Sequence, residues 1–333
     1  MDFKKSGLIL VLIVLAGAIF MAGCTGTQST GDATPAATEA VATAEQTPAA
    51  SEDNVLLIAT TTSLDATGLL AQLETEFEEK TGADVQITAV GTGKALEFGN
   101  NGDVDLLMVH DRSRENAFLD AGSGIERRVF AFNYFVIIGP ESDPAGIKGM
   151  APGDALVTIM EKGKEDENVK FVSRGDGSGT HGKEKALWKA VGLDYDENEP
   201  VWVKEDWYVE AGAGMGTTLT MADEMNAYTL SDIGTFLKYK GDETISLVEL
   251  VNEGDALINI YSAMIISPEK YPDTNVKLSK EWINFMTSDG VQEEIKVFGV
   301  EAYGQPLFFP AKGAVDILSP SGVTQEEISA AVV

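Results

Sequence analysis

The chain has 333 residues, of which 24 are lysine or arginine and 53 are aspartate or glutamate, so its formal net charge at pH 7 is −29. An acidic balance of this size argues against nucleic acid and anionic lipid surfaces as partners, because both are themselves negatively charged. The overall field also repels an anionic ligand, so any anion site must rely on local dipoles and a local cation.

The first 23 residues are typical of a secretory signal peptide. Lys4 and Lys5 precede an uncharged apolar run over residues 7–22, and small residues lead up to Cys24, the only cysteine in the chain. The run is shorter than the roughly 20 residues that a spanning helix needs, although an uncleaved signal anchor is the alternative. A lone cysteine at this point resembles the lipobox of a lipoprotein. We therefore predict that residues 1–23 are removed and that Cys24 carries lipid, unless the signal stays uncleaved and Cys24 has no role.

Residues 24–53 are rich in threonine, alanine, glycine, serine and proline. Such a stretch has too few apolar side chains to offset the entropy cost of ordering it, so it predicts a flexible tether behind the lipid anchor. The protein is then expected to be exported, and to work on the outer face of the cytoplasmic membrane or in the periplasm. Without residues 1–23 the chain keeps 22 basic and 52 acidic side chains, a net charge of −30. The remaining body of roughly 280 residues is large enough for two lobes.

From residue 54 onward, strand-like apolar runs alternate with helix-like segments. Residues 55–60, 85–90 and 104–109 are expected to form short buried strands, and the first is followed by a helical pattern that ends at Gly82. Strands that alternate with helices indicate an α/β fold, with a parallel sheet covered by helices on both faces.

Two longer apolar runs, residues 129–138 and 257–266, enclose a second alternating set of strands and helices. They predict a chain that leaves a first lobe, builds a second one and returns, so that two crossing strands form a hinge. We place lobe I at residues 54–133 plus 262–333 and lobe II at residues 134–261, with the ligand cleft between the lobes.

The most informative stretch, residues 171–181, lies between an expected strand and an expected helix. Its glycines let the backbone approach a ligand, and the helix N-terminus offers unpaired N–H groups and a partial positive charge. Arg174 adds a planar cation with paired donors, and Ser178 and Thr180 place hydroxyls on either side of Gly179. The pattern predicts an oxyanion site; the alternative is a glycine-rich loop whose hydroxyls only cap the helix.

Two further turns between a strand and a helix carry hydroxyl groups. The run of residues 60–63 follows the first expected strand, and Thr92 lies between two glycines after the second. Each turn by itself is explained by helix capping or simple turn formation. Three such turns in one chain favour a binding site over capping alone, because ligands bind at the carboxyl ends of strands in open α/β sheets. We therefore add Thr61, Thr62, Ser63 and Thr92 to the candidate anion-binding residues.

These motifs resemble the tungstate-binding proteins of ABC uptake systems. The segments that carry the resemblance are 59–63, 67–70, 90–96, 102–110, 133–136, 173–181, 207–208, 212–215 and 227–230. The family implies a type II periplasmic-binding-protein fold, with tungstate held between the lobes by the loops at 60–63 and 173–176. It also implies an ABC permease and its ATPase as partners, no cofactor apart from the transported oxyanion, no enzymatic activity, and a monomer.

Another tetrahedral oxyanion, whether molybdate, sulfate or phosphate, is the main alternative ligand. Phosphate carries a proton near neutral pH, and a specific site would offer that proton an acceptor, whereas the other three anions are fully ionised and require only donors. Every candidate side chain is a donor except Asp176, whose direction the sequence leaves open. Whether Met215 lines the cleft is open as well.

An exported hydrolase, with Ser178 as nucleophile and His181 as base, is a distant alternative, since Asp176 stands where a G-x-S-x-G elbow needs glycine. Residues 177–183 also match the start of a phosphate-binding P-loop, but Glu184 replaces the serine or threonine that would hold Mg²⁺. A site for a metal cation is not expected, because two histidines and one cysteine do not form a ligand cluster.

Overall fold

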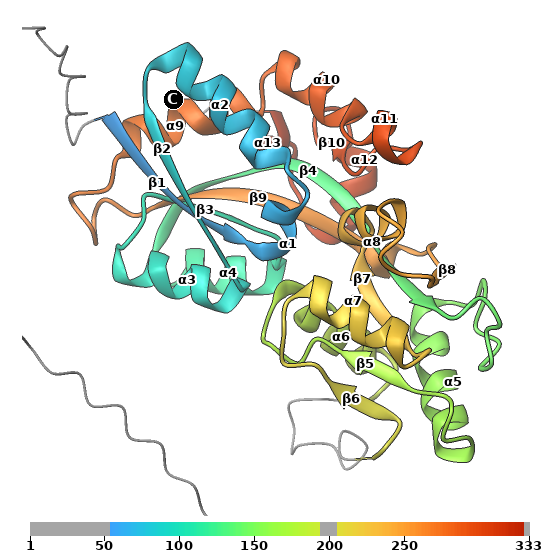
Figure 1. The fold of residues 1–333 in the computed structure, drawn as a ribbon. Helices are drawn as coiled ribbons and strands as arrows, with labels where there is room; N and C mark the ends of the chain where they lie inside the picture. The colour runs from blue at the N-terminus through green and yellow to red at the C-terminus, as the bar shows by residue number, and fades with distance from the viewer. Residues whose placement is uncertain (1–53, 194–204, 330–333) are drawn as a thin grey trace, which may run out of the picture. The chain divides into compact units, whose positions relative to one another are not determined.

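The computed structural model describes residues 54–193 and 205–329 of the chain (Figure 1). The predicted signal peptide (1–23), the lipid site at Cys24 and the tether (24–53) lie outside the described residues. Within the two described ranges, no helix combines the length and the apolar character needed to cross a membrane.

Helices and strands alternate along the chain, as the sequence predicts. The strands are β1 (Val55–Thr61), β2 (Asp84–Val90), β3 (Leu106–Val109), β4 (Gly124–Gly139), β5 (Phe171–Ser173), β6 (Tyr208–Glu210), β7 (Tyr228–Asp232), β8 (Val248–Val251), β9 (Ile258–Ile266) and β10 (Phe309–Pro310). The helices are α1 (Thr62–Ala66), α2 (Leu69–Thr81), α3 (Thr92–Asn101), α4 (Arg112–Asp120), α5 (Pro152–Glu165), α6 (Gly179–Ala190), α7 (Met215–Glu224), α8 (Ile233–Gly241), α9 (Val276–Met286), α10 (Asp289–Val297), α11 (Val300–Tyr303), α12 (Val315–Leu318) and α13 (Gln325–Ser329).

The strands of the described ranges form one sheet in the order β2-β1-β3-β9-β4-β7-β5-β6, with β10 and β8 also paired to β4. We call the end that holds β1, β2, β3, β9, β10 and the first part of β4 lobe I. The end that holds β5, β6, β7, β8 and the last part of β4 is lobe II. The predicted α/β class with two lobes is confirmed.

In lobe I, β1 lies between β2 and β3 and is parallel to both. Helices α2 and α9 cover one face of these strands, where the buried rings of Phe77 and Trp282 pack edge to face with their centroids 5.1 Å apart. Helix α2 ends at Gly82 as predicted, in the left-handed conformation (φ 73°) that glycine adopts without strain. Helices α3 and α4 cover the other face, where Ala95 and Phe118 belong to a second buried cluster.

In lobe II, β5 lies between β6 and β7 and is parallel to both. Helices α5 and α6 bury Leu156 and Trp188 on one face of this sheet, and α7 and α8 bury Leu219 and Phe236 on the other. Each lobe therefore has its own hydrophobic core around a parallel set of three strands. The carboxyl ends of β1, β2 and β5 are the positions where the sequence predicts ligand-binding turns.

The long strands β4 and β9 join the two lobes. Strand β4 pairs with β9 as far as Tyr134 and with β7 from Phe135 onward, so it changes lobe between these two residues. Asn133 of β4 and Asn259 of β9 lie opposite each other at this crossing. The two segments cross in opposite directions, and β9 is therefore antiparallel to both β3 and β4. The sheet is therefore mixed: the alternating strands of each lobe are parallel, as the sequence predicts, whereas the crossing strands β4 and β9 run antiparallel to their neighbours.

The C-terminal part of the described chain returns to lobe I, where two arginines anchor α13. Glu327 forms ion pairs with Arg127 at 2.6 Å and with Arg112 at 2.7 Å. Burial disfavours the ionised carboxylate, but hydrogen bonds from Arg112, from the backbone N–H of Thr324 and from Arg127 outweigh it and lower the pKa of Glu327 to about 2. These contacts hold Arg112 at the start of α4, directly after the end of β3.

Candidate functional site

The three turns predicted from the sequence follow β1, β2 and β5, and each opens a helix. Thr61 caps α1 by accepting a hydrogen bond from the backbone N–H of Leu64 at 3.3 Å. Ser178 caps α6 in the same way, accepting from the N–H of His181 at 3.2 Å. Thr92 is the first residue of α3 and is fully buried. Helix capping, the alternative role predicted from the sequence, therefore occurs at Thr61 and Ser178. Capping does not explain the other donor groups of these turns.

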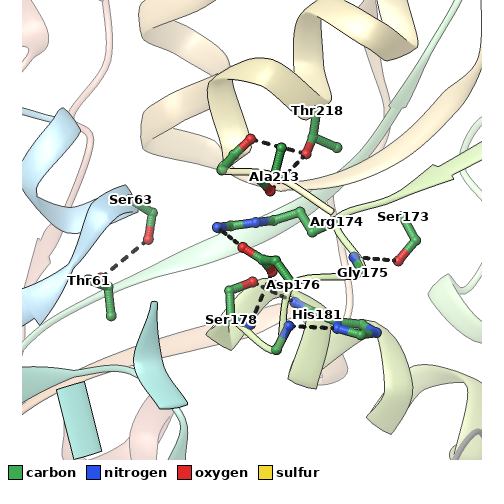
Figure 2. A network of polar contacts seen from close by, with 12 residues as sticks. Thr61, Ser63, Ser173, Arg174, Gly175, Asp176, Ser178, His181, Ala213 and Thr218 are labelled. Atoms are coloured by element: carbon green, nitrogen blue, oxygen red, sulfur yellow. Dashed lines mark hydrogen bonds and ion pairs between the residues drawn. The ribbon is translucent and has the colours of Figure 1, made fainter. Parts of the chain in front are cut away.

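Arg174 follows directly after β5 and is only 3% exposed. Its Nη2 atom forms an ion pair of 2.5 Å with a carboxylate oxygen of Asp176, and the other oxygen of Asp176 accepts from the N–H of Ser178 at 3.1 Å. Figure 2 shows the guanidinium extending from lobe II toward Thr61 and Ser63 of lobe I. The structure thus answers the question left open by the sequence: Asp176 braces Arg174, and both of its oxygens have partners.

Three buried donor groups on the predicted turns have no hydrogen-bond partner within the described residues. They are the hydroxyl groups of Thr92 and Thr180 and the Nε atom of Arg174. A buried donor without a partner costs about 1–3 kcal/mol, so proteins rarely retain one without a reason. One of the three belongs to lobe I and two belong to lobe II, which indicates a ligand that accepts hydrogen bonds from both lobes.

The turns of the two lobes lie against each other. The Arg114 side chain of α4 donates from Nη1 to the carbonyl oxygen of Gly177 at 2.7 Å. A Cβ built on Gly93 would lie 3.8 Å from the same carbonyl oxygen, so the turn before α3 also approaches the loop of Arg174. A Cβ on Gly179 would come within 2.7 Å of the ring of His110. Glycine is required at position 179 because the imidazole of lobe I occupies the space where a side chain would be.

A pocket of about 220 Å³ lies between α1 of lobe I and the helices α7 and α8 of lobe II. Its lining residues are Thr62, Ser63, Ala66, Gly214, Met215, Gly216, Thr217, Thr235 and Tyr239. Met215 therefore borders the interlobe space while it also packs in the core of lobe II. Of the eight candidate residues, Thr62 and Ser63 line this pocket, Arg174 points toward Thr61 and Ser63 in Figure 2, and Gly179 contacts lobe I through His110. The remaining candidates, Thr92, Ser178 and Thr180, belong to the same turns. That each of them contacts an anion stays a prediction.

The sequence analysis did not identify His110 as a site residue. This side chain follows β3, is 6% exposed, and connects the Ser63 hydroxyl to the crossing strands. Its Nε2 atom lies 3.2 Å from Ser63 Oγ, and its Nδ1 atom lies 2.9 Å from Asn259 Oδ1. The Asn259 amide then donates to Asn133 Oδ1 at 2.9 Å. The available signal was its position at the carboxyl end of a buried strand, in a chain with only two histidines.

The proton positions in this chain of hydrogen bonds follow from its far end. The amide of Asn133 donates to the carbonyl oxygen of Leu307 at 3.1 Å, and a carbonyl oxygen can only accept. Each following bond then has one possible direction, so the His110 proton resides on Nδ1 and Nε2 accepts the Ser63 hydroxyl proton. Burial lowers the pKa of His110 to about 4, with the charges of Arg174 and other nearby cations adding to the effect, so the ring is neutral near pH 7.

The arrangement of His181 does not provide a base for Ser178. The Nδ1 atom of His181 accepts the N–H of Gly177 at 3.0 Å, so the neutral ring carries its proton on Nε2. No lone pair of the imidazole then remains to take a proton from the Ser178 hydroxyl, as a hydrolase would need. Among residues 54–193 and 205–329, no three His, Cys, Asp or Glu side chains gather as a possible metal site.

Known proteins resemble this chain in both sequence and structure. The model of a PBP superfamily domain matches residues 34–290. The chain is 41% identical over 255 residues to the tungstate-binding protein TupA of Peptoclostridium acidaminophilum, covering 77% of this chain and 85% of the relative. The solved structure of the tungstate-binding protein TupA from Desulfovibrio alaskensis G20 superposes with a TM-score of 0.64 at 44% identity, covering 77% of this chain and 98% of that one. A tungstate ABC transporter structure from Geobacter sulfurreducens superposes with a TM-score of 0.62 at 42% identity, covering 72% and 97%.

Proposed function

The chain belongs to the PBP superfamily and, within it, to the family of tungstate-binding proteins, and on this basis we propose that its two lobes capture tungstate as the substrate-binding component of an ABC transporter. The relatives named above support this assignment over most of the length of both chains. Molybdate, sulfate and phosphate remain the ligands against which the assignment has to be tested.

The observation that carries the proposal is the set of unpaired buried donors at the junction of the lobes. The hydroxyls of Thr92 and Thr180 and the Nε atom of Arg174 can all donate to one acceptor-rich ligand. Asp176 is the carboxylate that follows Arg174 in this loop, and its two oxygens are already engaged by Arg174 and by the N–H of Ser178. Because Asp176 is engaged in this way, it leaves no carboxylate oxygen without a partner for the proton of hydrogen phosphate, which favours a fully ionised oxyanion.

The direct test is a calorimetric titration of the purified protein with tungstate, molybdate, sulfate and phosphate at one salt concentration. We expect tungstate to bind most tightly. Phosphate should bind more weakly by roughly 10- to 100-fold, because its buried proton would lack an acceptor. Phosphate binding as tight as that of tungstate would contradict a site built of donors alone, and an absence of binding for all four anions would contradict the proposal itself.

The same proposal assigns the protein its partners and its place in the cell. We infer that it is exported, that it acts as a monomer, and that it delivers the anion to a membrane permease driven by an ATPase subunit. The tungstate-binding relatives support the binding role, and the sequence of residues 1–24 supports export and attachment to the membrane.

Lipid attachment is tested by mass spectrometry of the protein isolated from its native membrane. We expect the loss of residues 1–23 and a lipid adduct on Cys24 with more than one acyl chain, because a single chain gives only marginal membrane binding. The variant Cys24→Ser should lack the adduct and leave the membrane fraction. A mature N-terminus at another position, with an unmodified thiol, would show that the lipobox assignment is wrong.

Loss of the unpaired Thr92 hydroxyl is expected to weaken tungstate binding without lowering the stability of the unliganded protein. We expect Thr92→Val to weaken tungstate binding by about 1.5 kcal/mol, or roughly tenfold, because one hydrogen bond to a charged ligand is lost. The unliganded variant should unfold at the same temperature as the parent or slightly higher, since the hydroxyl has no partner to lose.

The matched control for this variant is Thr60→Val. Thr60 is equally buried and belongs to the run 60–63, but its hydroxyl already donates to the carbonyl oxygen of Met108 at 3.0 Å and therefore has no proton to offer a ligand. Its replacement should lower the unfolding temperature and leave the affinity for tungstate close to that of the parent. If Thr92→Val lowers stability and keeps full affinity, the hydroxyl of Thr92 serves the fold and not the ligand.

A further inference from the structure

Glu184 is a buried carboxyl group in α6 that the proposed function does not by itself explain. It is 1% exposed, and its contacts are hydrogen bonds from neutral donors. They come from Ser173 Oγ at 2.6 Å, Tyr208 OH at 2.6 Å and Trp188 Nε1 at 3.2 Å. Within the described parts of the chain it has no ion-pair partner. A buried carboxylate without a neighbouring cation destabilises the fold. Its presence in the helix that follows the loop of Arg174 therefore suggests a role in that loop.

Ser173 connects this carboxyl group to the loop of Arg174. The hydroxyl proton of Ser173 points to Glu184, so a lone pair of the same oxygen is free to accept the N–H of Gly175 at 3.2 Å. That N–H belongs to the peptide directly after Arg174. Gly175 has a φ of +61°, and a Cβ there would lie 2.9 Å from the Cβ of Glu210, so the loop holds an unusual backbone conformation in a confined space. The bond from Ser173 fixes the orientation of this peptide.

We propose that Glu184 is a positioning residue of the anion site: it orients Ser173, which holds the peptide after Arg174, and its negative charge opposes the bound anion until it takes up a proton. This inference rests on the proposed function, because both the positioning role and the charge effect require an anion beside Arg174.

The groups around Glu184 favour a proton on this carboxyl group. Burial raises the pKa of Glu184 to about 7, against the hydrogen bonds from Ser173, Tyr208 and Trp188, and the carboxylate of Glu210 on β6 raises it further. Tyr208 and Glu210 are the titratable groups that β6 places near it, while Ser173 on β5 and Trp188 on its own helix are neutral. When Glu184 is protonated on Oε1, it can donate to the Tyr208 hydroxyl, and Oε2 continues to accept from Ser173.

The sign of the pH effect follows from these charges. A dianion bound near Arg174 disfavours the ionised form of Glu184 and therefore raises its pKa above the value of about 7 in the free protein. Below that value the group is protonated before and after binding, and the affinity is at its maximum. As the pH rises through the interval between the free and the bound pKa, binding must draw in a proton, and the affinity falls.

The experiment is a calorimetric titration with tungstate between about pH 6.5 and pH 9, where this anion is fully ionised, in buffers of different ionisation enthalpy. For the parent we expect the affinity to fall by about tenfold over this range, with net proton uptake on binding, since one unit of pKa difference corresponds to a tenfold change. In Glu184→Gln the profile should be flat and no proton should be taken up. Retention of the parent's pH dependence in Glu184→Gln overturns the inference, as does a flat profile in a parent that binds tungstate.

Glu115 supplies the matched control. It is also fully buried, and burial also raises its pKa to about 7, but it lies in lobe I and pairs with Arg127 at 3.5 Å. Glu115→Gln should keep the pH profile of the parent, whatever its effect on stability. If Glu115→Gln flattens the profile, the proton is taken up there and not at Glu184.

Two further variants separate the parts of the inference. Ser173→Ala removes the contact to Gly175 and should weaken tungstate binding by about tenfold at every pH, since the peptide after Arg174 is no longer held. Unchanged affinity overturns the positioning role.

Tyr208→Phe removes one donor to the carboxylate and should move the fall in affinity to higher pH. This variant also tests the inference if Glu184→Gln does not fold. An unmoved profile in this variant counts against Glu184. A parent that binds no tungstate at any pH contradicts the proposed function instead.

Discussion

Replacement of Arg174 by alanine is expected to weaken tungstate binding by roughly 10²–10⁴-fold. Arg174 is the cation that the loop after β5 directs at the junction of the lobes, and it is almost fully buried there. Removing one partner of a buried charge pair costs about 3–5 kcal/mol. The structure adds a second contribution, because Asp176 would lose its ion pair of 2.5 Å and leave an uncompensated negative charge beside the anion.

Titration of Arg174→Ala, Arg174→Lys and Arg128→Ala at one salt concentration tests this prediction. Lysine keeps the charge but cannot serve Asp176 and the anion together, as the planar fork of arginine can, so its affinity should lie between those of the parent and the alanine variant. Arg128 is similarly buried but pairs with Glu126 at 3.0 Å on the strand β4, so its replacement controls for the loss of a buried arginine as such. If Arg174→Ala binds tungstate within about threefold of the parent, the anion site lies elsewhere.

Replacement of Gly179 by alanine is the second change expected to have a large effect. The added methyl group would lie 2.7 Å from Cε1 and 3.0 Å from Nδ1 of His110, closer than side-chain carbons approach. The imidazole cannot rotate away without breaking its contacts to Ser63 and Asn259. The lobes must separate instead. Overpacking of this kind costs about 1–3 kcal/mol, so we expect tungstate affinity to fall by roughly 10- to 100-fold.

Gly214→Ala is the control for this substitution. Gly214 also borders the interlobe pocket, but a Cβ at that position meets nothing within 4 Å. Small-angle scattering at saturating tungstate should give a larger radius for Gly179→Ala than for the parent and for Gly214→Ala. Equal affinity and equal radius for all three proteins would show that the contact between Gly179 and His110 does not limit closure.

Much of the fold follows from local patterns in the chain. The helix that starts after Gly68 ends at Gly82 because its apolar residues repeat at helical spacing up to a glycine that takes a positive φ. The turns at 60–63, 91–94 and 173–180 were recognisable because glycines and hydroxyl residues sit between a strand pattern and a helix pattern. The pairing of β9 could not be predicted in this way, since its antiparallel direction depends on where the chain returns after building lobe II.

The sequence by itself determined which turns carry donors and which residue is the cation, because these properties belong to single side chains and to their neighbours along the chain. Only the tertiary structure decided which donors remain unpaired. Asp176 forms an ion pair with Arg174, and His110 accepts a hydrogen bond from the Ser63 hydroxyl because two asparagines on the crossing strands fix its tautomer. Glu184, which the sequence shows only as a residue that breaks a P-loop pattern, is connected to the loop of Arg174 by the hydrogen bond that it accepts from Ser173, eleven residues earlier. The physical reason is common to these cases: a hydrogen bond needs a partner in a defined direction, and that partner is brought into place by contacts between distant parts of the chain.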